Sequence, residues 1–432
     1  MSVPYALALV ATSAVILLGI MAGVKQLGRR FEWSPELQRK AVHVATGIYA
    51  TCLPLIFSDR WPVLLLIGIA AAVMLILRRP RLAKSDLGAT LHGVERKSYG
   101  ELLLAAAIAF TFSESVGKPV LYVLPMAILT LADAAAALIG TRYGRKFLAV
   151  EIGTKSVEGV AMFFMVSWIT AMILLLLLTD IARPNVVLLS VIVAGFGALV
   201  EVDSWHGLDN LFIPVGLYLF LARYLEAPPL NLLLVTVAFV TVMVAGIALG
   251  KCLGLSAHAS RGYTILFFLI LVVTAPHNAI LPWAAVTTHL AVARSRPCSS
   301  RHANLDFLVA ASAVALFWLF VGESTGINAL NVYNLTFASV ALIFVALGQS
   351  NSKFAVLLSA AALYAIVLTT IRWNAASTGQ VLGWWWIAPS FGLCVLVPFA
   401  LPQIFDQYRS WRAFAVALPI PLAAFASLMV RT

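Results

Sequence analysis

The sequence has few charged residues, few cysteines and almost no acidic residues in its second half. Only 11% of its 432 residues are charged, whereas about a quarter of the residues in soluble domains are charged. Its 62% of hydrophobic residues and its mean hydropathy of +0.97 exclude a soluble globular protein. The four cysteines form no CxxC motif, which excludes the common zinc and disulfide frameworks. Such a chain places most of its surface in lipid.

Long apolar segments fill the sequence. A spanning helix needs about 20 apolar residues, and about sixteen windows approach this length: 4–24, 41–57, 62–77, 101–113, 119–141, 157–179, 185–201, 211–225, 229–250, 263–275, 279–293, 307–321, 330–348, 354–371, 383–401 and 413–430. The first window lacks a basic start and a small-residue cleavage site, so we interpret it as a span and not as a signal peptide. We predict an all-α polytopic transmembrane helical bundle of about 14–16 spans.

Basic residues concentrate in every second connection between the predicted spans. With the N-terminus outside, 23 of the 29 lysines and arginines fall in cytoplasmic connections. The other six are Arg60, Lys118, Arg183, Arg223, Arg372 and Arg431. This asymmetry is the one that the positive-inside rule predicts. The net charge of +11 is therefore an orientation signal spread over short loops, and we expect no nucleic-acid partner.

Acidic residues divide the chain into two unlike halves. Fifteen of the 18 lie at or before Glu226, and only Asp306, Glu323 and Asp406 follow. Pro228 and Pro229 mark a plausible boundary. We predict a catalytic transmembrane domain at 1–225 and a second transmembrane helical domain, of unknown role, at 226–432. Carboxylates are the ligands that Mg²⁺ prefers, so metal or phosphate chemistry belongs to the first domain.

The strongest candidate site surrounds Asp133, a carboxylate inside an apolar helix. Such a residue is costly in a membrane and indicates function. About six residues later the chain enters a polar turn from Gly140 to Lys146, which contains Arg142, Gly144 and Arg145. These cations suit a polyphosphate. Lys155, Ser156 and Glu158 then open the next span, where a helix N-terminus is a natural anion site. The alternative interpretation is a positive-inside loop with a helix cap.

Three further clusters map to the same predicted cytoplasmic face. Lys40 and His43 share one helix face at the start of the second span. Glu101 opens the fourth span, directly after the basic stretch 96–97. The stretch 201–210 contains Glu201, Asp203 and Asp209 but no lysine or arginine, which favours a divalent cation. Snorkelling, the helix dipole and simple solvation are the alternatives for these clusters.

These residues resemble the signature of integral-membrane CTP-using enzymes, a superfamily of phytol/dolichol/farnesol kinases and phosphatidate cytidylyltransferases. The matching pattern is Asp133…Gly140…Tyr143-Gly144…Lys155-Ser156…Glu158-Gly159. Arg39-Lys40 with His43 and Gly47, Gly100-Glu101-Leu102, and Glu201…Asp209-Asn210-Leu211 with Pro214 are similar to elements of the kinase branch. The resemblance covers about residues 35–225. The sequence has a single Asp209 where the family often has paired aspartates before the asparagine.

The resemblance implies a Mg²⁺-dependent transfer of a phosphoryl group from CTP, or another nucleoside triphosphate, to a long-chain isoprenoid alcohol. It implies these roles: catalytic residues Asp133, His43, Glu101 and Lys155; nucleotide-binding residues Lys40, Gly140, Arg142, Gly144, Lys146, Ser156 and Glu158; metal ligands Asp133, Glu201, Asp209 and Asn210. Either His43 or Glu101 would act as general base. The expected partners are the alcohol, the nucleotide and membrane lipids. The expected location is a cell inner or plasma membrane, with the site facing the cytoplasm.

Two other functions remain open. The same site could transfer a cytidylyl group and make a CDP-activated lipid, in which case pyrophosphate and not CDP would be released. A transporter or flippase is the candidate from another class, because the chain has so many spans. Transporters usually carry internal repeats and polar groups near the midplane. The sequence shows no internal repeat, and its polar groups cluster at one surface.

Overall fold

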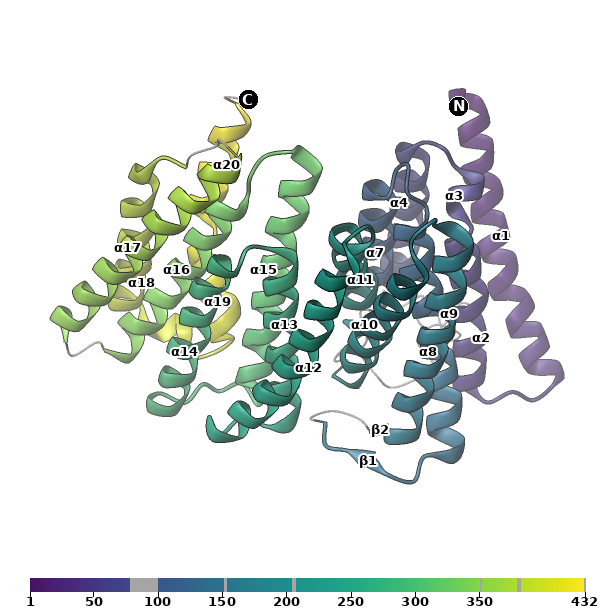
Figure 1. Ribbon diagram of the computed structural model, residues 1–432, viewed down its shortest axis with the longest axis horizontal. Helices are drawn as coiled ribbons and strands as arrows, with labels where there is room; N and C mark the ends of the chain where they lie inside the picture. The colour runs from purple at the N-terminus through teal and green to yellow at the C-terminus, as the bar shows by residue number, and fades with distance from the viewer. Residues whose placement is uncertain (78–99, 151–153, 204–206, 350–351, 379–381, 431–432) are drawn as a thin grey trace. The chain divides into compact units, whose positions relative to one another are not determined.

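The computed structural model describes residues 1–77, 100–150, 154–203, 207–349, 352–378 and 382–430 (Figure 1). In these ranges the regular secondary structure is helical, apart from one hairpin of two short strands. This confirms the predicted all-α fold. The basic stretch 96–97 and residues 204–206 of the predicted stretch 201–210 lie outside the described residues. The elements of the first half are α1 (Val3–Arg30), α2 (Pro35–Thr51), α3 (Leu53–Ile56), α4 (Arg60–Leu77), α7 (Gly100–Glu114), α8 (Val120–Tyr143), β1 (Phe147–Leu148), β2 (Lys155–Ser156), α9 (Val157–Leu178), α10 (Arg183–Val202) and α11 (Asp209–Tyr224).

The second half is also helical, and short 3₁₀ turns precede some of its helices. Its elements are α12 (Pro229–Cys252), α13 (Ala257–Val273), η1 (Pro276–Ala279), α14 (Ile280–Ser295), α15 (Ala303–Thr325), α16 (Leu330–Gly348), α17 (Lys353–Thr378), η2 (Trp384–Trp386), α18 (Ile387–Ala400), η3 (Pro402–Phe405), α19 (Arg409–Ala417) and α20 (Pro419–Met429). Each of the predicted apolar windows lies on one or two of these helices.

Nine helical segments of the described chain are long and apolar enough to cross a membrane. Three shorter apolar helices accompany them. The protein is therefore a multi-pass membrane protein by the length and composition of its helices. The predicted range of 14–16 spans also counts α2, α7, α11 and α14, which have only 15 to 17 residues each. Helices of this length are shorter than the 20 residues that a straight span needs.

Two compact units share the chain, Met1–Ala245 and Gly246–Thr432. The boundary between the two units falls inside α12, sixteen residues after Pro229. The functional boundary at 225/226 stays a prediction. In unit 1, α8 is the central helix, and it packs against α2, α9 and α11. In unit 2 the central helix is α16, which packs against α14, α17 and α18 and is almost completely buried.

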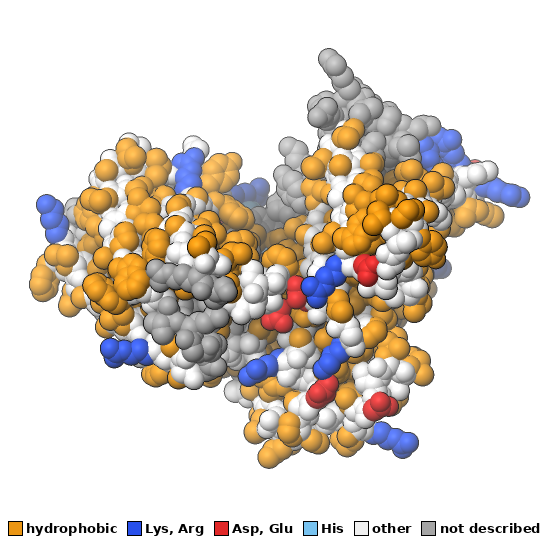
Figure 2. All heavy atoms as spheres, turned by 90° about the horizontal axis from the view of Figure 1, so that it is seen from above, with side chains coloured by type: hydrophobic (Ala, Val, Ile, Leu, Met, Phe, Trp, Pro, Cys, Tyr) orange, Lys and Arg blue, Asp and Glu red, His pale blue; other side chains and the backbone are white. Residues whose placement is uncertain are grey.

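The surface is mostly apolar, as lipid contact requires. Figure 2 shows hydrophobic side chains over most of the visible face, with lysine, arginine and acidic side chains in a few places. Exposed large side chains such as Leu7, Ile169 and Val240 lie on long apolar helices. A soluble protein rarely exposes so much contiguous apolar surface. These faces are the ones that a bilayer would cover.

Candidate active site

Three carboxylates from three helices meet at one end of unit 1. Asp133 lies in the second half of α8, Glu201 in the last turn of α10, and Asp209 in the first turn of α11. One oxygen of each lies within 4.8 Å of the others. Asp133 and Glu201 are buried, and Asp209 is half-buried. The helix dipole and the loss of solvation both disfavour a negative charge on a buried carboxylate at a helix C-terminus, such as Glu201. A positively charged or metal partner is therefore needed to stabilise it.

Two lysines supply positive charge to this carboxylate cluster. The Lys40 Nζ of α2 donates to both oxygens of Asp133, at 2.9 and 2.7 Å. The Lys155 Nζ of β2 donates to Glu201 Oε1. Lys40 is buried although it lies only six residues from the start of α2. The paired residues are 46 and 93 positions apart in the chain, so the tertiary fold alone brings them together.

The geometry around His43 indicates which nitrogen carries a proton. His43 Nε2 lies 3.2 Å from Asp133 Oδ2 and 3.5 Å from the carbonyl oxygen of Leu129. Both neighbours only accept hydrogen bonds, so Nε2 is the donor. In the neutral ring, Nδ1 then carries the free lone pair. The Asp133 carboxylate fixes this tautomer and holds the ring in place.

The cluster still has unused acceptor capacity. Glu201 Oε2 and Asp209 Oδ1 are buried and have no hydrogen-bond partner within the described residues. Three carboxylates against two ammonium groups leave one negative charge, with His43 neutral. Burial alone would lower the pKa of Lys155, but the Glu201, Asp209 and Asp133 carboxylates outweigh burial and raise it. Lys155 therefore stays charged, and the excess of acceptors fits a divalent cation.

The predicted phosphate-binding glycines and Ser156 also have a packing role. The Ser156 hydroxyl accepts from the Gly159 N–H at 3.1 Å and caps α9. A Cβ atom on Gly159 would lie 3.0 Å from the Ala136 carbonyl oxygen, and one on Gly144 would lie 2.9 Å from Ser156 Cβ. Gly140 and Gly159 also face each other across α8 and α9. These contacts explain the close packing of the two helices and the fixed position of Lys155.

A short hairpin joins α8 to α9 and carries the predicted cations (Figure 1). Its strands pair Phe147 with Ser156 and Leu148 with Lys155. Glu158 accepts from the Lys146 N–H at 3.4 Å, and the Arg142 guanidinium lies 5.5 Å from the centre of the Tyr143 ring. Arg142 and Lys146 are exposed. The structure thus places Lys155 in the carboxylate cluster and leaves these other two cations on the rim, open to water.

Glu101 and Asn210 lie at the same end of unit 1. Asn210 follows Asp209 in the first turn of α11, and Glu101 is in the first turn of α7. The ring centres of Tyr218 on α11 and Phe110 on α7 lie 5.2 Å apart, and the Tyr218 hydroxyl donates to the Glu114 carbonyl oxygen of α7. Lys118, just after α7, also pairs with Glu226, just after α11, so the two helices run in the same direction and their first turns lie at the same end. Both side chains are half-buried, which leaves Glu101 open as a candidate base.

Unit 2 contains a buried polar network that was not predicted from the sequence. Asn278 Oδ1 accepts from Asn334 at 2.6 Å and from Asn374 at 3.0 Å. Asn374 Nδ2 also donates to Asn331, and its Oδ1 accepts from His277 Nε2 at 2.7 Å. The four asparagines are at most 3% exposed. Four asparagines within apolar segments were the available signal, but nothing in their spacing shows that they meet.

Comparison with known proteins identifies one kind of relative. The chain is 28% identical to a phytol kinase of Synechocystis sp. over 208 residues, which are 47% of this chain and 86% of that kinase. No protein-family model matches the chain, and no solved structure is significantly similar to it. The similarity supports a distant relationship between this chain and the phytol kinases.

Proposed function

We propose that unit 1 is a membrane-embedded kinase that transfers a phosphoryl group from CTP, or another nucleoside triphosphate, to a long-chain isoprenoid alcohol. The observation that carries the proposal is the convergence of Asp133, Glu201 and Asp209 with Lys40 and Lys155. Phosphoryl transfer depends mainly on positioning and charge neutralisation, which such a cluster supplies. The similarity to a phytol kinase supports this reaction class and an isoprenoid acceptor such as phytol, farnesol or a polyprenol.

Mg²⁺ fits the donor set of the cluster. The cation prefers carboxylates together with substrate phosphate oxygens, and the buried oxygens Glu201 Oε2 and Asp209 Oδ1 have no partner in the described part of the chain. We assign Asp133 and Asp209 as its ligands, with Glu201 and Asn210 as support. When bound, the ion would offset charge on the phosphates. Lys40 and Lys155 now neutralise Asp133 and Glu201, and they could turn to the phosphates once a divalent cation is present.

The nucleotide phosphates would lie over the hairpin end of α8. Lys155 is held in the cluster, whereas Arg142 and Lys146 stand at its exposed rim. These three cations could neutralise a triphosphate from two sides. Gly140, Gly144 and the Ser156 cap keep α8 and α9 close together, and Glu158 holds the Lys146 backbone. In this proposal the glycines, Ser156 and Glu158 shape the nucleotide-binding turn and Lys40 neutralises charge beside it.

The transfer itself requires a base near the hydroxyl group of the alcohol. The hydroxyl oxygen bonds to the terminal phosphorus, the bond from that phosphorus to the bridging oxygen breaks, and the nucleoside diphosphate leaves. The hydroxyl proton would pass to His43 Nδ1, the nitrogen that the Asp133 contact leaves unprotonated. Glu101 remains the second candidate. The apolar tail would stay in the bilayer, with the hydroxyl group at the membrane face that the charge pattern assigns to the cytoplasm.

Product analysis with the purified full-length protein tests this proposal. CTP and ATP labelled in the γ-phosphate are supplied with Mg²⁺ and phytol, farnesol or polyprenols in detergent. Label in a lipid monophosphate together with release of CDP is the expected result. Release of pyrophosphate and formation of a CDP-linked lipid would identify cytidylyl transfer instead. No transfer to any acceptor, in protein shown to be folded, would contradict the enzyme and favour transport.

Matched variants locate the reaction in the cluster. Asp133→Asn keeps the shape of the side chain but removes its charge, and should abolish transfer. Glu323→Gln changes an exposed acid at the end of α15, in unit 2, and should leave transfer unchanged. Comparison of His43→Gln with Glu101→Gln assigns the base, because loss of the base should lower kcat most at high pH, where the wild-type base is unprotonated, and should remove the fall of kcat in acid.

A further inference from the structure

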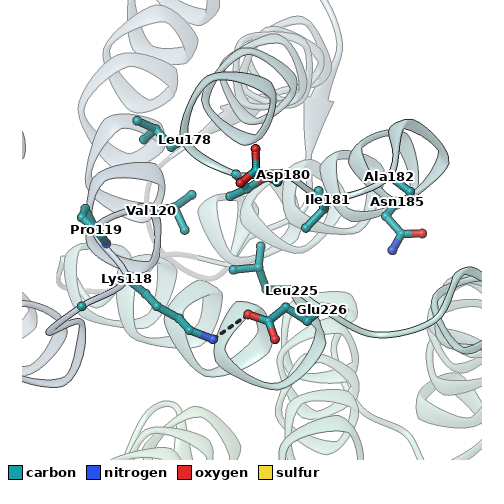
Figure 3. A pocket seen from close by; sticks show the side chains of 12 residues that line it. Lys118, Pro119, Val120, Leu178, Asp180, Ile181, Ala182, Asn185, Leu225 and Glu226 are labelled. Atoms are coloured by element: carbon teal, nitrogen blue, oxygen red, sulfur yellow. Dashed lines mark hydrogen bonds and ion pairs between the residues drawn. The ribbon is translucent and has the colours of Figure 1, made fainter.

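A cavity of about 520 Å³ lies at the other end of unit 1 from the carboxylates (Figure 3). Its walls come from the start of α8, the end of α9, the start of α10 and the end of α11. Asp133 is thirteen residues beyond Val120 of the wall, a rise of about 20 Å along α8. Glu201 is sixteen residues beyond Asn185, about 24 Å along α10. The hydrocarbon core of a bilayer is about 30 Å thick, so the cavity lies near the opposite headgroup layer.

Two polar links hold the walls of this cavity in place. Lys118 Nζ donates to Glu226 Oε1 at 2.7 Å, which ties the loop before α8 to the end of α11. Asn185 Nδ2 donates to the Ala227 carbonyl oxygen at 2.9 Å and ties α10 to the same segment. Asn185 is 6% exposed, and its Oδ1 has no hydrogen-bond partner among the described residues. These two links connect the segments that line the cavity, and the Asn185 amide is itself buried, so the acceptors open to a ligand are the carboxylates.

The charged groups of the lining indicate the chemistry of a ligand. Lys118 contributes one positive charge, and Asp180 and Glu226 contribute two negative charges. Glu226 is paired with Lys118, whereas Asp180 forms no ion pair with any described residue. The excess of acceptors over cations disfavours an anion and favours a ligand that carries an ammonium group. Lys118 lies within the same cavity, where it could face a phosphate.

The apolar side chains of the described lining, and its lack of aromatic ones, restrict the class of ligand further. Val120, Leu178, Ile181 and Leu225 form apolar walls suited to hydrocarbon chains (Figure 3). The described lining has no phenylalanine, tyrosine or tryptophan. Quaternary ammonium groups are bound mainly by aromatic faces, since they have no N–H donors. A primary ammonium group, with three N–H donors, matches carboxylate oxygens such as those of Asp180 and Glu226 instead.

We propose that this cavity binds the headgroup of a phospholipid with a primary ammonium group, a phosphoethanolamine headgroup. Its ammonium group lies between Asp180 and Glu226, its phosphate faces Lys118, and its acyl chains leave along the apolar walls. The site is separate from the proposed kinase chemistry and does not depend on it. A lipid there would bridge the loop before α8 and the ends of α9 and α11.

Native mass spectrometry of the full-length protein tests the proposal. The protein in detergent is titrated with dioleoyl phosphatidylethanolamine, phosphatidylglycerol and phosphatidylcholine. We expect phosphatidylethanolamine to be retained about tenfold more strongly than the other two, because charge-assisted hydrogen bonds give differences of this size. The double variant Asp180→Asn with Glu226→Gln should remove the preference. The control, Glu323→Gln with Lys353→Gln, changes exposed charges in unit 2 and should keep it.

Two further experiments test whether the amine lipid itself binds in this cavity. Leu178→Trp fills the cavity from a partly exposed wall position and should lower retention of the amine lipid without removing any charge. Soluble glycerophosphoethanolamine should compete only weakly, since it lacks the acyl chains. Equal retention of all three lipids, a preference for phosphatidylglycerol, unchanged retention in the double variant, or equal binding of the soluble ester would each overturn the proposal.

Discussion

Lys40 and Asp133 form a bidentate ion pair across 93 residues of sequence, with both side chains buried. Close packing of α2 on α8 makes this contact possible. A Cβ atom on Gly47 would lie within 3.0 Å of the Thr130 side chain, so only glycine lets the helices approach so closely at that point. The pair places a charge-neutralising lysine at the carboxylate that the proposed chemistry needs most. Mutation can therefore separate what the pair contributes to the stability of the protein from what it contributes to the proposed function.

The first prediction concerns the two sides of this pair. Asp133→Asn leaves Lys40 buried without its counter-charge, which should cost about 3–5 kcal/mol of unfolding free energy. The double variant Lys40→Met with Asp133→Leu removes both charges and should recover most of that loss. Titration with SDS in mixed micelles measures the stability. Transfer activity should be absent from both variants, and activity in the double variant would contradict the proposed role.

The second prediction is a requirement for a divalent cation. Removal of Mg²⁺ with EDTA should abolish transfer, and Asp209→Asn should raise the Mg²⁺ concentration for half-maximal activity by about tenfold or more. Binding of Mn²⁺, followed by electron paramagnetic resonance, gives a readout that is independent of turnover. Asp306→Asn, which changes an acid in unit 2, serves as control. Unchanged Mn²⁺ binding in Asp209→Asn would remove Asp209 from the ligand set.

The third prediction tests the contact between α8 and α9. Gly159→Ala would place a Cβ atom 3.0 Å from the Ala136 carbonyl oxygen and 3.3 Å from Gly140 Cα. We expect a loss of about 1–3 kcal/mol, as for other overpacked sites. Gly68→Ala is the matched control, because no atom lies within 4 Å of its added Cβ. This control should be neutral or stabilising, since alanine favours helix over glycine. Equal stability of the two variants would show that the helices can separate without cost.

The fourth prediction concerns the asparagine network of unit 2. Asn278→Ala removes the shared acceptor of Asn334 and Asn374 and leaves their amides buried. Each unsatisfied group should cost about 1–3 kcal/mol. Gln407→Ala, at an exposed amide, should have little effect. The thermal unfolding midpoint of the full-length protein measures both, and a midpoint equal to that of the control would mean that the network contributes nothing to stability.

The fifth prediction concerns pH. The hydrogen bond and charge of Lys118 lower the pKa of Glu226 below its ordinary value. A lowered folded-state pKa contributes stability that is present above the unfolded pKa, about 4.3, and is lost as the pH falls through the folded pKa. The stability difference between wild type and Glu226→Gln should thus be constant near pH 7 and vanish in acid. A difference that grows on acidification would contradict the sign. The effect should be small, because the pair is exposed.

Much of the site was predictable because each motif is local. Asp133 is unusual in an apolar helix, and the stretch from Glu201 to Asp209 breaks the charge pattern of the loops around it. The alternation of basic residues placed these segments on one face before any contact was known. The side-chain contacts between these residues were not predictable from the sequence. The sequence predicts that Lys40 binds nucleotide, which stays a prediction, and it gives no sign that the Lys40 ammonium group donates to both oxygens of Asp133.

By itself the sequence determined a helical membrane protein and the candidate residues, since apolar periodicity and isolated charges are properties of short segments. Only the tertiary structure decided which charges meet and that four asparagines distant in sequence share one network. It also decided that the ends of four helices line an open cavity at the end of unit 1 away from the carboxylates. The physical reason is that ion pairing and hydrogen bonding act over a few ångströms, and helix packing sets those distances between residues far apart in the chain.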